Sequence, residues 1–315
     1  MKEKKTAINT LVDGDMVDDI FVVKFKKPVE PYKNGFRFEL RIGDASKEIM
    51  AKYWGPNDQS LVQQLYESIQ KDSVVHIIGR VQEWNEQLEI STKTITLVNH
   101  GSYDPAAFIR KSTKNIEEMY KDLMQHITQV HDEHLKGLLL HFFGNADFAK
   151  QFKVAPAAMY LHHGWIGGLL EHTLAVTRIA LSYCEIHKSL NKDLVITGCL
   201  FHDMGKLQEF DVGTSIRMST EGMLIGHVTI AVQELTKAMQ ELQLPKELQW
   251  KVNHMVLTHM GEYGSSKTPS FPEALAVFYA DQADAQLTHM IDVKEHANTE
   301  DEHMYSKHFG NVYLQ

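Results

Sequence analysis

The sequence has little of what extracellular and membrane proteins are built with. Its 315 residues include only two cysteines, Cys184 and Cys199. Both lie in apolar helical stretches, which predicts reduced, buried thiols and excludes a disulfide framework. No run approaches the roughly 18 apolar residues of a membrane span, and the opening MKEKKTAINT lacks the apolar core of a secretory signal. We therefore expect a cytoplasmic protein without membrane partners.

An excess of basic charge is also missing. The formal net charge is -9, which argues against a protein that binds nucleic acid by electrostatics alone. Residues 1–100 hold 14 basic and 15 acidic side chains, so they carry -1 of this charge and the remainder carries -8. Metal-binding carboxylates inflate such a count, while the bound ions return positive charge locally. A basic patch on the first domain therefore remains compatible with the composition.

What the sequence does contain is a set of histidines and aspartates in apolar helices. His202 and Asp203 end the segment LVITGCLFHD, whose apolar part predicts a helix buried on all sides. Buried imidazoles and carboxylates need polar partners or a cation. His172 stands beside the apolar stripe of a helix predicted over WIGGLLEHTLAVTRIALSYC. Asp281 lies among apolar residues in FPEALAVFYADQADAQL, where a carboxylate is costly unless it is paired or metal-bound.

Two more histidines extend this set. His227 opens the predicted helix GHVTIAVQELTKAM, and His259 falls on the apolar stripe of the next helix, close to Gly261. His254 lies off that stripe, which favours a structural role for it. Imidazole and carboxylate ligands together suit Mn, Fe, Co, Ni or Zn. The predicted metal ligands are His172, His202, Asp203, His227, His259 and Asp281.

The first third of the chain predicts five strands and one helix. The strands are IFVVKFKKP, FRFELRIGD, EIMAKYWG, SVVHIIGRVQEW and LEISTKTITLV, and the helix SLVQQLYESIQ follows the third. This order is typical of an OB-fold barrel, which commonly binds single-stranded nucleic acid. Cations can follow the phosphate backbone while aromatic rings stack on bases. The predicted contacts are Lys24, Lys26, Arg37 and Trp54, with Tyr32, Tyr53 and Trp84 as alternative stacking residues or core residues.

The length allows two domains, each with its own core. The segment NHGSYDPAAF, with its glycine and proline, predicts a connection. We therefore expect a multidomain α+β protein. An N-terminal five-stranded OB-fold β-barrel (1–100) and a linker (101–114) precede an all-α domain (115–315).

The segments HHGWIGGLLEHTLAV, FHDMGKLQEF, STEGMLIGHV, NHMVLTHMGEYGS and PEALAVFYADQADA resemble those of the HD-domain metal phosphohydrolases. Among these they are similar to the YhaM-type 3′-to-5′ exoribonucleases, which also carry an N-terminal OB-fold. The resemblance covers nearly the whole chain. It implies that Asp203 bridges two metal ions, Mn being the expected metal. Met260 stands where many relatives have a second histidine, so the second site is expected to be weaker or to use His254.

The resemblance also implies an activity. The first hypothesis is an exonuclease that hydrolyses single-stranded RNA, or also single-stranded DNA, to 5′-mononucleotides by metal-activated water. Asp203 and Lys206 are its predicted catalytic residues, and Lys206 and His163 are predicted to contact substrate. His163 has a supporting role as the alternative. Two other functions stay open: a phosphohydrolase of nucleotides or cyclic dinucleotides, and a non-catalytic single-stranded DNA-binding replication accessory protein. The oligomeric state is also open.

Overall fold

The computed structural model describes residues 2–159, 163–261, 267–295, 297, 299 and 301–315. The chain divides into two compact units. The first contains residues 1–110 together with the short segment 212–216, and the second contains residues 111–211 and 217–315. Parts of two sequence motifs, residues 160–162 and 262–266, lie outside the described residues.

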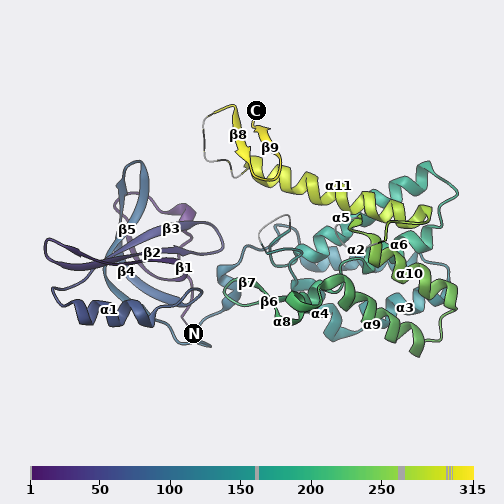
Figure 1. The fold of residues 1–315 in the computed structure, drawn as a ribbon, viewed down its shortest axis with the longest axis horizontal. Helices are drawn as coiled ribbons and strands as arrows, with labels where there is room; N and C mark the ends of the chain where they lie inside the picture. Colours follow the sequence, from purple (N-terminus) through teal and green to yellow (C-terminus); the bar gives the residue numbers. More distant parts are fainter. Residues whose placement is uncertain (1, 160–162, 262–266, 296, 298, 300) are drawn as a thin grey trace. The chain divides into compact units, whose positions relative to one another are not determined.

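The first unit is a closed five-stranded barrel with strand order β1-β2-β3-β5-β4 (Figure 1). Only the β3–β5 pair is parallel. The chain enters it through a short 3₁₀ helix, η1 (Ile8–Thr10). The elements are β1 (Met16–Tyr32), β2 (Gly35–Gly43), β3 (Glu48–Trp54), α1 (Gln59–Ser68), β4 (Val74–Trp84) and β5 (Gln87–Leu97). The predicted OB-type barrel, with its helix between the third and fourth strands, is confirmed.

Alternation of apolar and polar residues builds the β2 strand of this barrel. In β2, Phe38, Leu40 and Ile42 point into the core and are at most 1% exposed. Arg37 and Glu39 lie between them and point outward, because successive side chains of a strand face opposite sides. A one-residue shift in register would bury the charges, so the pattern fixes the pairing of β2 with its neighbours.

The segment after β5 packs against the barrel. It includes the 3₁₀ helix η2 (Pro105–Phe108). Tyr103 and Phe108 form a small apolar cluster with Ile20, Val22 and Val98. The division into 1–100, 101–114 and 115–315 stays a prediction.

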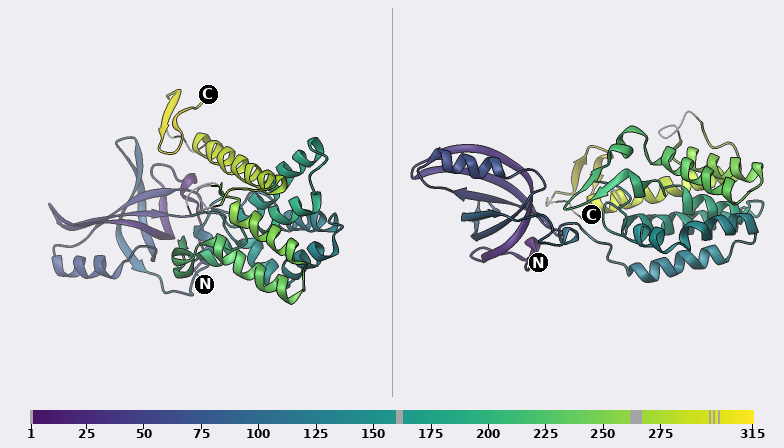
Figure 2. Two further views of the ribbon diagram at one scale, coloured as in Figure 1. Left: turned by 45° about the vertical axis from the view of Figure 1, so that its right-hand side comes forward. Right: turned by 90° about the horizontal axis from the view of Figure 1, so that it is seen from below.

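The second unit is mainly helical, as predicted. Its helices are α2 (Ile116–Thr128), α3 (Glu133–Phe143), α4 (Ala146–Val154), α5 (Gly168–Ile186), α6 (Lys192–Phe201), α7 (Lys206–Glu209), α8 (Thr220–Leu224), α9 (His227–Glu241), α10 (Lys246–Thr258) and α11 (Pro272–Glu295). Two short hairpins, β6 (Phe210–Val212) with β7 (Ile216–Met218) and β8 (His303–Ser306) with β9 (Gly310–Tyr313), were not predicted. Figure 2 shows the β8–β9 hairpin beyond the C-terminal end of α11.

Helix α6 lies at the centre of this unit. Asn191 caps it by accepting hydrogen bonds from the backbone N–H groups of Asp193 and Leu194. All residues from Leu194 to Phe201 are buried, and α6 packs against α3, α5, α10 and α11. Because α6 is buried up to its last residue, Phe201, the two residues that follow it, His202 and Asp203, also lie in the interior. Within the described part of the chain, no helix is long and apolar enough to cross a membrane.

Candidate metal centre and nucleic-acid face

The six predicted metal ligands meet at one site in the second unit. They come from α5, the residues directly after α6, the start of α9, the residue after α10, and α11. Their atoms form two groups, each with ligand atoms within 4.8 Å of one another. We call these group A, which is His172, His202 and Asp281, and group B, which is Asp203, His227 and His259.

Asp203 connects the two groups. Its Oδ2 lies 3.4 Å from Nε2 of both His172 and His202, which belong to group A. Its Oδ1 lies 3.5 Å from Nε2 of His227 and 3.4 Å from Nε2 of His259, which belong to group B. One carboxylate thus presents a different oxygen to each pair of imidazoles, which is the arrangement of a ligand that bridges two cations.

The four imidazoles are held in one tautomer. Each Nδ1 faces an oxygen that only accepts: Asp284 Oδ2 for His172, Cys199 O for His202, Glu209 Oε1 for His227 and Val256 O for His259. Nδ1 must therefore carry the proton, and in a neutral ring the lone pair is then on Nε2. All four Nε2 atoms point toward Asp203 or Asp281. This is how histidines are prepared for a metal ion.

The distances between these atoms fit a metal site. His172 Nε2 lies 3.2 Å from both His202 Nε2 and Asp281 Oδ1. Ligands at about 2.0–2.2 Å from one ion are separated from each other by roughly 3.0–3.5 Å. Asp203 Oδ1 and His227 Nε2 are buried and form no hydrogen bond. Such atoms are costly unless something binds them, so the donor set fits a divalent cation.

The charges of the site give the same indication. Burial would raise the pKa of Asp203, but Lys206 and His202 hold it well below its usual range. Burial also opposes ionisation of Asp281, yet its hydrogen bond to His172 and the nearby imidazoles lower its pKa to about 2. Burial would lower the pKa of His172, but hydrogen bonds to three carboxylates raise it well above the usual value. The ionised carboxylates thus favour a cation at this position.

Lys206 and His163 lie beside this centre. Lys206 Nζ donates to Asp203 Oδ2 at 2.6 Å, and its side chain is 12% exposed. His163 is 4% exposed, and its Nε2 lies 3.0 Å from Asp284 Oδ2. That burial favours the supporting role over direct contact with substrate. The substrate contacts of both residues stay predictions.

The structure does not bring His254 into either group. Its Nε2 accepts a hydrogen bond from the backbone N–H of Ser270 at 3.0 Å, and its ring centre lies 5.4 Å from that of Phe271. Group B therefore has His227 and His259 as its imidazoles. Met260 stands where many relatives have a second histidine. The position of His254 argues against the expectation that His254 takes over as a ligand there.

On the barrel, the four predicted nucleic-acid contacts have different surroundings. Lys26 Nζ donates to the carbonyl oxygens of Tyr66 and Ile69 at the end of α1, so its charge is used within the fold. Lys24 is partly buried, and this burial lowers the pKa of its amine. The contacts of both lysines with nucleic acid stay predictions.

Arg37 and Trp54 do form a local surface. They are cross-strand partners in β2 and β3, and the Arg37 guanidinium lies 5.4 Å from the centre of the Trp54 ring. Trp54 is held by a hydrogen bond from Nε1 to Ser91 Oγ and by an edge contact with Tyr32. Tyr53, by contrast, packs against Phe38 in the core.

Two further residues belong to the same face. Trp84 is 61% exposed at the end of β4, and Lys52 Nζ lies 5.8 Å from its ring centre. Lys52 also pairs with Glu89. Lys52 and Trp54 are two residues apart in β3, so they share its outward side. We call Arg37, Lys52, Trp54 and Trp84 the barrel face. Lys52 was not predicted to bind nucleic acid, because only three-dimensional structure places it against an exposed ring.

Comparison with known proteins assigns these features to a family. The HD domain family matches residues 169–286, which contain all six predicted ligands. The 3′-5′ exoribonuclease YhaM of Shouchella clausii is 30% identical over 88% of this chain and 86% of its own length. The Bacillus velezensis protein of the same name is 30% identical over 88% of this chain and 87% of its own length. The crystal structure of the L. monocytogenes phosphodiesterase PgpH HD domain gives a TM-score of 0.31 at 18% identity, over 48% of this chain and 80% of that chain.

Proposed function

The chain belongs to the YhaM family of 3′-5′ exoribonucleases, and from this premise we propose that it shortens single-stranded RNA from the 3′ end and releases 5′-mononucleotides. Hydrolysis depends on divalent metal, and two ions are bound per chain. Mn is the proposed metal, with Co, Fe, Ni and Zn as alternatives of suitable ligand preference. Single-stranded DNA is a second substrate to be tested.

The observation that carries this proposal is the placement of Asp203 between the two ligand groups. Each of its oxygens lies 3.4–3.5 Å from two imidazole Nε2 atoms. Asp281 completes group A, whereas group B consists, among the residues that the structure describes, of Asp203 and its two histidines. The ion of group B would then keep coordination positions for water or substrate.

The residues of the site have distinct tasks. The two groups hold the ions, and bound ions would supply an activated water and offset charge on the phosphate during in-line attack. Lys206 holds Asp203 in place in this structure. Its ammonium group is close enough to the site to place one positive charge near a scissile phosphate. His163 and Asp284 support His172 from the side away from the ligand groups.

The barrel supplies a binding surface for the single-stranded RNA. Single-strand binding that tolerates any sequence combines aromatic rings for stacking with cations for the phosphates. The barrel face offers both: two tryptophans, with Arg37 against one ring and Lys52 against the other. We propose that this face, within a nucleic-acid-binding domain of residues 1–100, holds the substrate. The catalytic domain is then 115–315, after the linker 101–114, and the protein acts in the cytoplasm.

The test is a time course with Mn and a single-stranded RNA labelled at its 5′ end. Asp203→Asn is the matched variant, because it keeps the side-chain size and removes the bridging charge. We expect a ladder that shortens from the 3′ end with the wild type and no shortening with D203N. The same strand as DNA reports the sugar preference.

The alternatives predict other results. Intact strands that shift on a native gel would favour the non-catalytic binding protein. Intact and unbound strands would direct the search to nucleotides or cyclic dinucleotides as substrates. Either outcome would overturn the proposed exoribonuclease.

A further inference from the structure

Two buried carboxylates stand behind the metal ligands without being ligands themselves. Asp284 is 8% exposed and Glu209 is 6% exposed. Asp284 lies in α11, one turn after Asp281, and Glu209 ends α7. Each accepts a hydrogen bond from Nδ1 of one ligand histidine, on the side opposite Nε2. Their positions raise the question of why two of the four histidines need a carboxylate.

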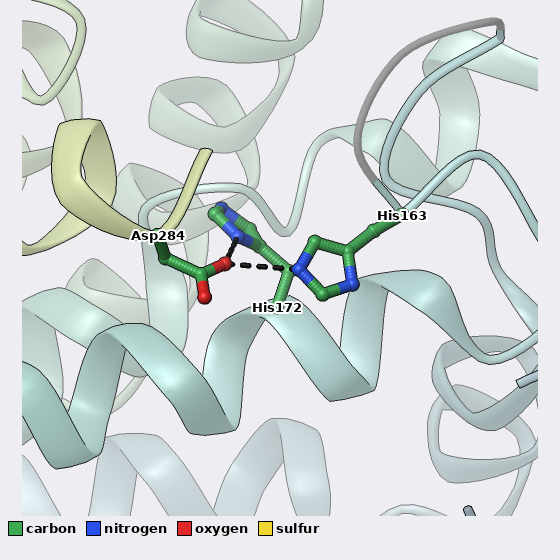
Figure 3. A group of neighbouring side chains, drawn as sticks. All are labelled: His163, His172 and Asp284. Carbon is green, nitrogen blue, oxygen red and sulfur yellow. Dashed lines mark hydrogen bonds and ion pairs between the residues drawn. The ribbon is translucent and has the colours of Figure 1, made fainter. Parts of the chain in front are cut away.

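Asp284 supports the group A histidine His172. Figure 3 shows one carboxylate oxygen of Asp284, Oδ2, in contact with the rings of both His172 and His163. The distances are 2.6 Å to His172 Nδ1 and 3.0 Å to His163 Nε2. Both are hydrogen-bond distances, which leave no room for an ion between these atoms. His163 thus fixes the carboxylate that fixes His172.

The backbone around His163 is strained and tightly packed. His163 has a φ of 54°, a left-handed conformation that costs a non-glycine residue about 1–3 kcal/mol. Its carbonyl oxygen lies so close to Gly168 that a Cβ there would be 2.0 Å away. The imidazole of His163 thus reaches Asp284 from a strained backbone, and this arrangement requires a glycine at position 168.

Glu209 supports the group B histidine His227 in the same manner. Its Oε1 receives His227 Nδ1 at 2.8 Å and the backbone N–H of His227 at 3.1 Å. The second bond fixes the carboxylate here too. Each group thus contains one histidine oriented by a carboxylate from a distant part of the chain.

The other two histidines are held differently. His202 Nδ1 donates to Cys199 O at 2.7 Å, and His259 Nδ1 donates to Val256 O at 2.7 Å. Both acceptors are backbone carbonyls three residues earlier in the helix that ends there. Each group therefore pairs one carbonyl-held histidine with one carboxylate-held histidine.

We propose that Asp284 and Glu209 are separate positioning residues, Asp284 for the ion of group A and Glu209 for the ion of group B. The proposal rests on the proposed two-metal function. A carboxylate that accepts from Nδ1 orients the ring and makes Nε2 more basic, whereas a neutral carbonyl does so less. Losing such a partner typically weakens metal binding about 10- to 100-fold. The weakening should be confined to the group that the carboxylate serves.

The experiment measures Mn binding to the full chain by calorimetry and by the electron paramagnetic resonance signal of free Mn. The variants are Asp284→Asn and Glu209→Gln. We expect the wild type to bind two ions, and each variant to bind one ion about 10- to 100-fold more weakly while the other is unchanged. Excess Mn should restore hydrolysis in both variants, which a loss of folding would not allow.

Ligand variants identify which site is affected. His172→Ala removes a ligand of group A, and His227→Ala removes one of group B. In the His172→Ala background, D284N should not weaken the binding of the remaining ion any further, whereas E209Q should weaken its binding. The reverse is expected in the His227→Ala background. This crossing pattern separates two independent supports from a general loss of structure.

Controls use carboxylates that are not placed against a ligand histidine. Asp292 lies two turns further along α11, and Glu221 lies in α8, the helix that follows α7. Neither Asp292→Asn nor Glu221→Gln should change either binding step. If D284N and E209Q weaken the same ion, or both ions equally, or neither, the division between them is wrong. If the wild type binds no Mn and leaves RNA intact, the proposed function fails instead, so the two failures are distinguishable.

Discussion

Replacing Gly205 with alanine should damage group B through the backbone. A Cβ at Gly205 would lie 2.0 Å from the carbonyl oxygen of His227 and 3.0 Å from the amide nitrogen of Ala231. Ordinary contact begins at 3.4 Å, so α7 and the start of α9 would have to separate by about 1.4 Å, the difference between 3.4 and 2.0 Å. Both obstacles are backbone atoms, which cannot rotate away.

This displacement would move His227, the first residue of α9. A misplacement of about 1 Å in a catalytic site costs roughly 100-fold in rate, and overpacking costs about 1–3 kcal/mol of stability. We therefore expect G205A to shorten RNA about 100-fold more slowly and to bind one of its two Mn ions more weakly. The assays are the labelled-RNA time course, Mn calorimetry and a urea denaturation curve.

Gly137→Ala is the matched control. Gly137 lies inside α3, and a Cβ there would meet nothing within 4 Å. Because alanine is the better helix former, this variant should gain about 0.5–1 kcal/mol with no change in rate. Wild-type rate and wild-type Mn binding in G205A would refute the argument that the contact between α7 and α9 positions His227.

Three further predictions concern the ions, the barrel face and acid stability. Saturating Mn at about 100 times its Kd should stabilise the protein by about 2.7 kcal/mol for each bound ion, and Asp203→Ala should abolish this shift in a thermal melt with and without chelator. Trp84→Ala should weaken binding of long RNA while sparing dinucleotide hydrolysis; Trp250→Ala, 69% exposed on α10, is the control, and equal loss in both would count against stacking on the barrel face. Burial opposes ionisation of Asp44, but hydrogen bonds from Ser46 and Ile8 lower its pKa below 3.8. Its stabilising effect is therefore present above that value and lost on further acidification, so the unfolding free energy of Asp44→Asn should depend less on pH below about 4.

The sequence was sufficient to predict the elements whose pattern is local. The alternation in β2 and the wholly apolar run of α6 are each visible in a few residues, and both predict the observed structure. The ordered histidines and aspartates could also be selected, because a polar ligand in an apolar helix is conspicuous. The structure then brings all six into two adjoining groups, and their role as ligands stays a prediction.

What the sequence could not provide was pairing between distant segments. Lys26 was predicted to contact phosphate, which stays a prediction, but the sequence did not show that its ammonium group donates to carbonyls at the end of α1, 40 and 43 residues away. Glu209 gave no signal, since its partner His227 comes 18 residues later and beyond a hairpin. Asp284 was visible only as a second carboxylate one turn after Asp281. Such pairs follow from how helices pack, which local periodicity does not encode.

The last helix has a consequence for when this enzyme becomes able to act. Both Asp281 and its neighbour Asp284 lie in α11, whereas the helix ends that hold His202 and His259 form earlier in the chain. A chain still being synthesised on the ribosome therefore has its carbonyl-held histidines before it has a complete group A. On this basis an RNA-degrading activity would arise only after α11 has docked, and an incomplete chain beside its own messenger would be inactive.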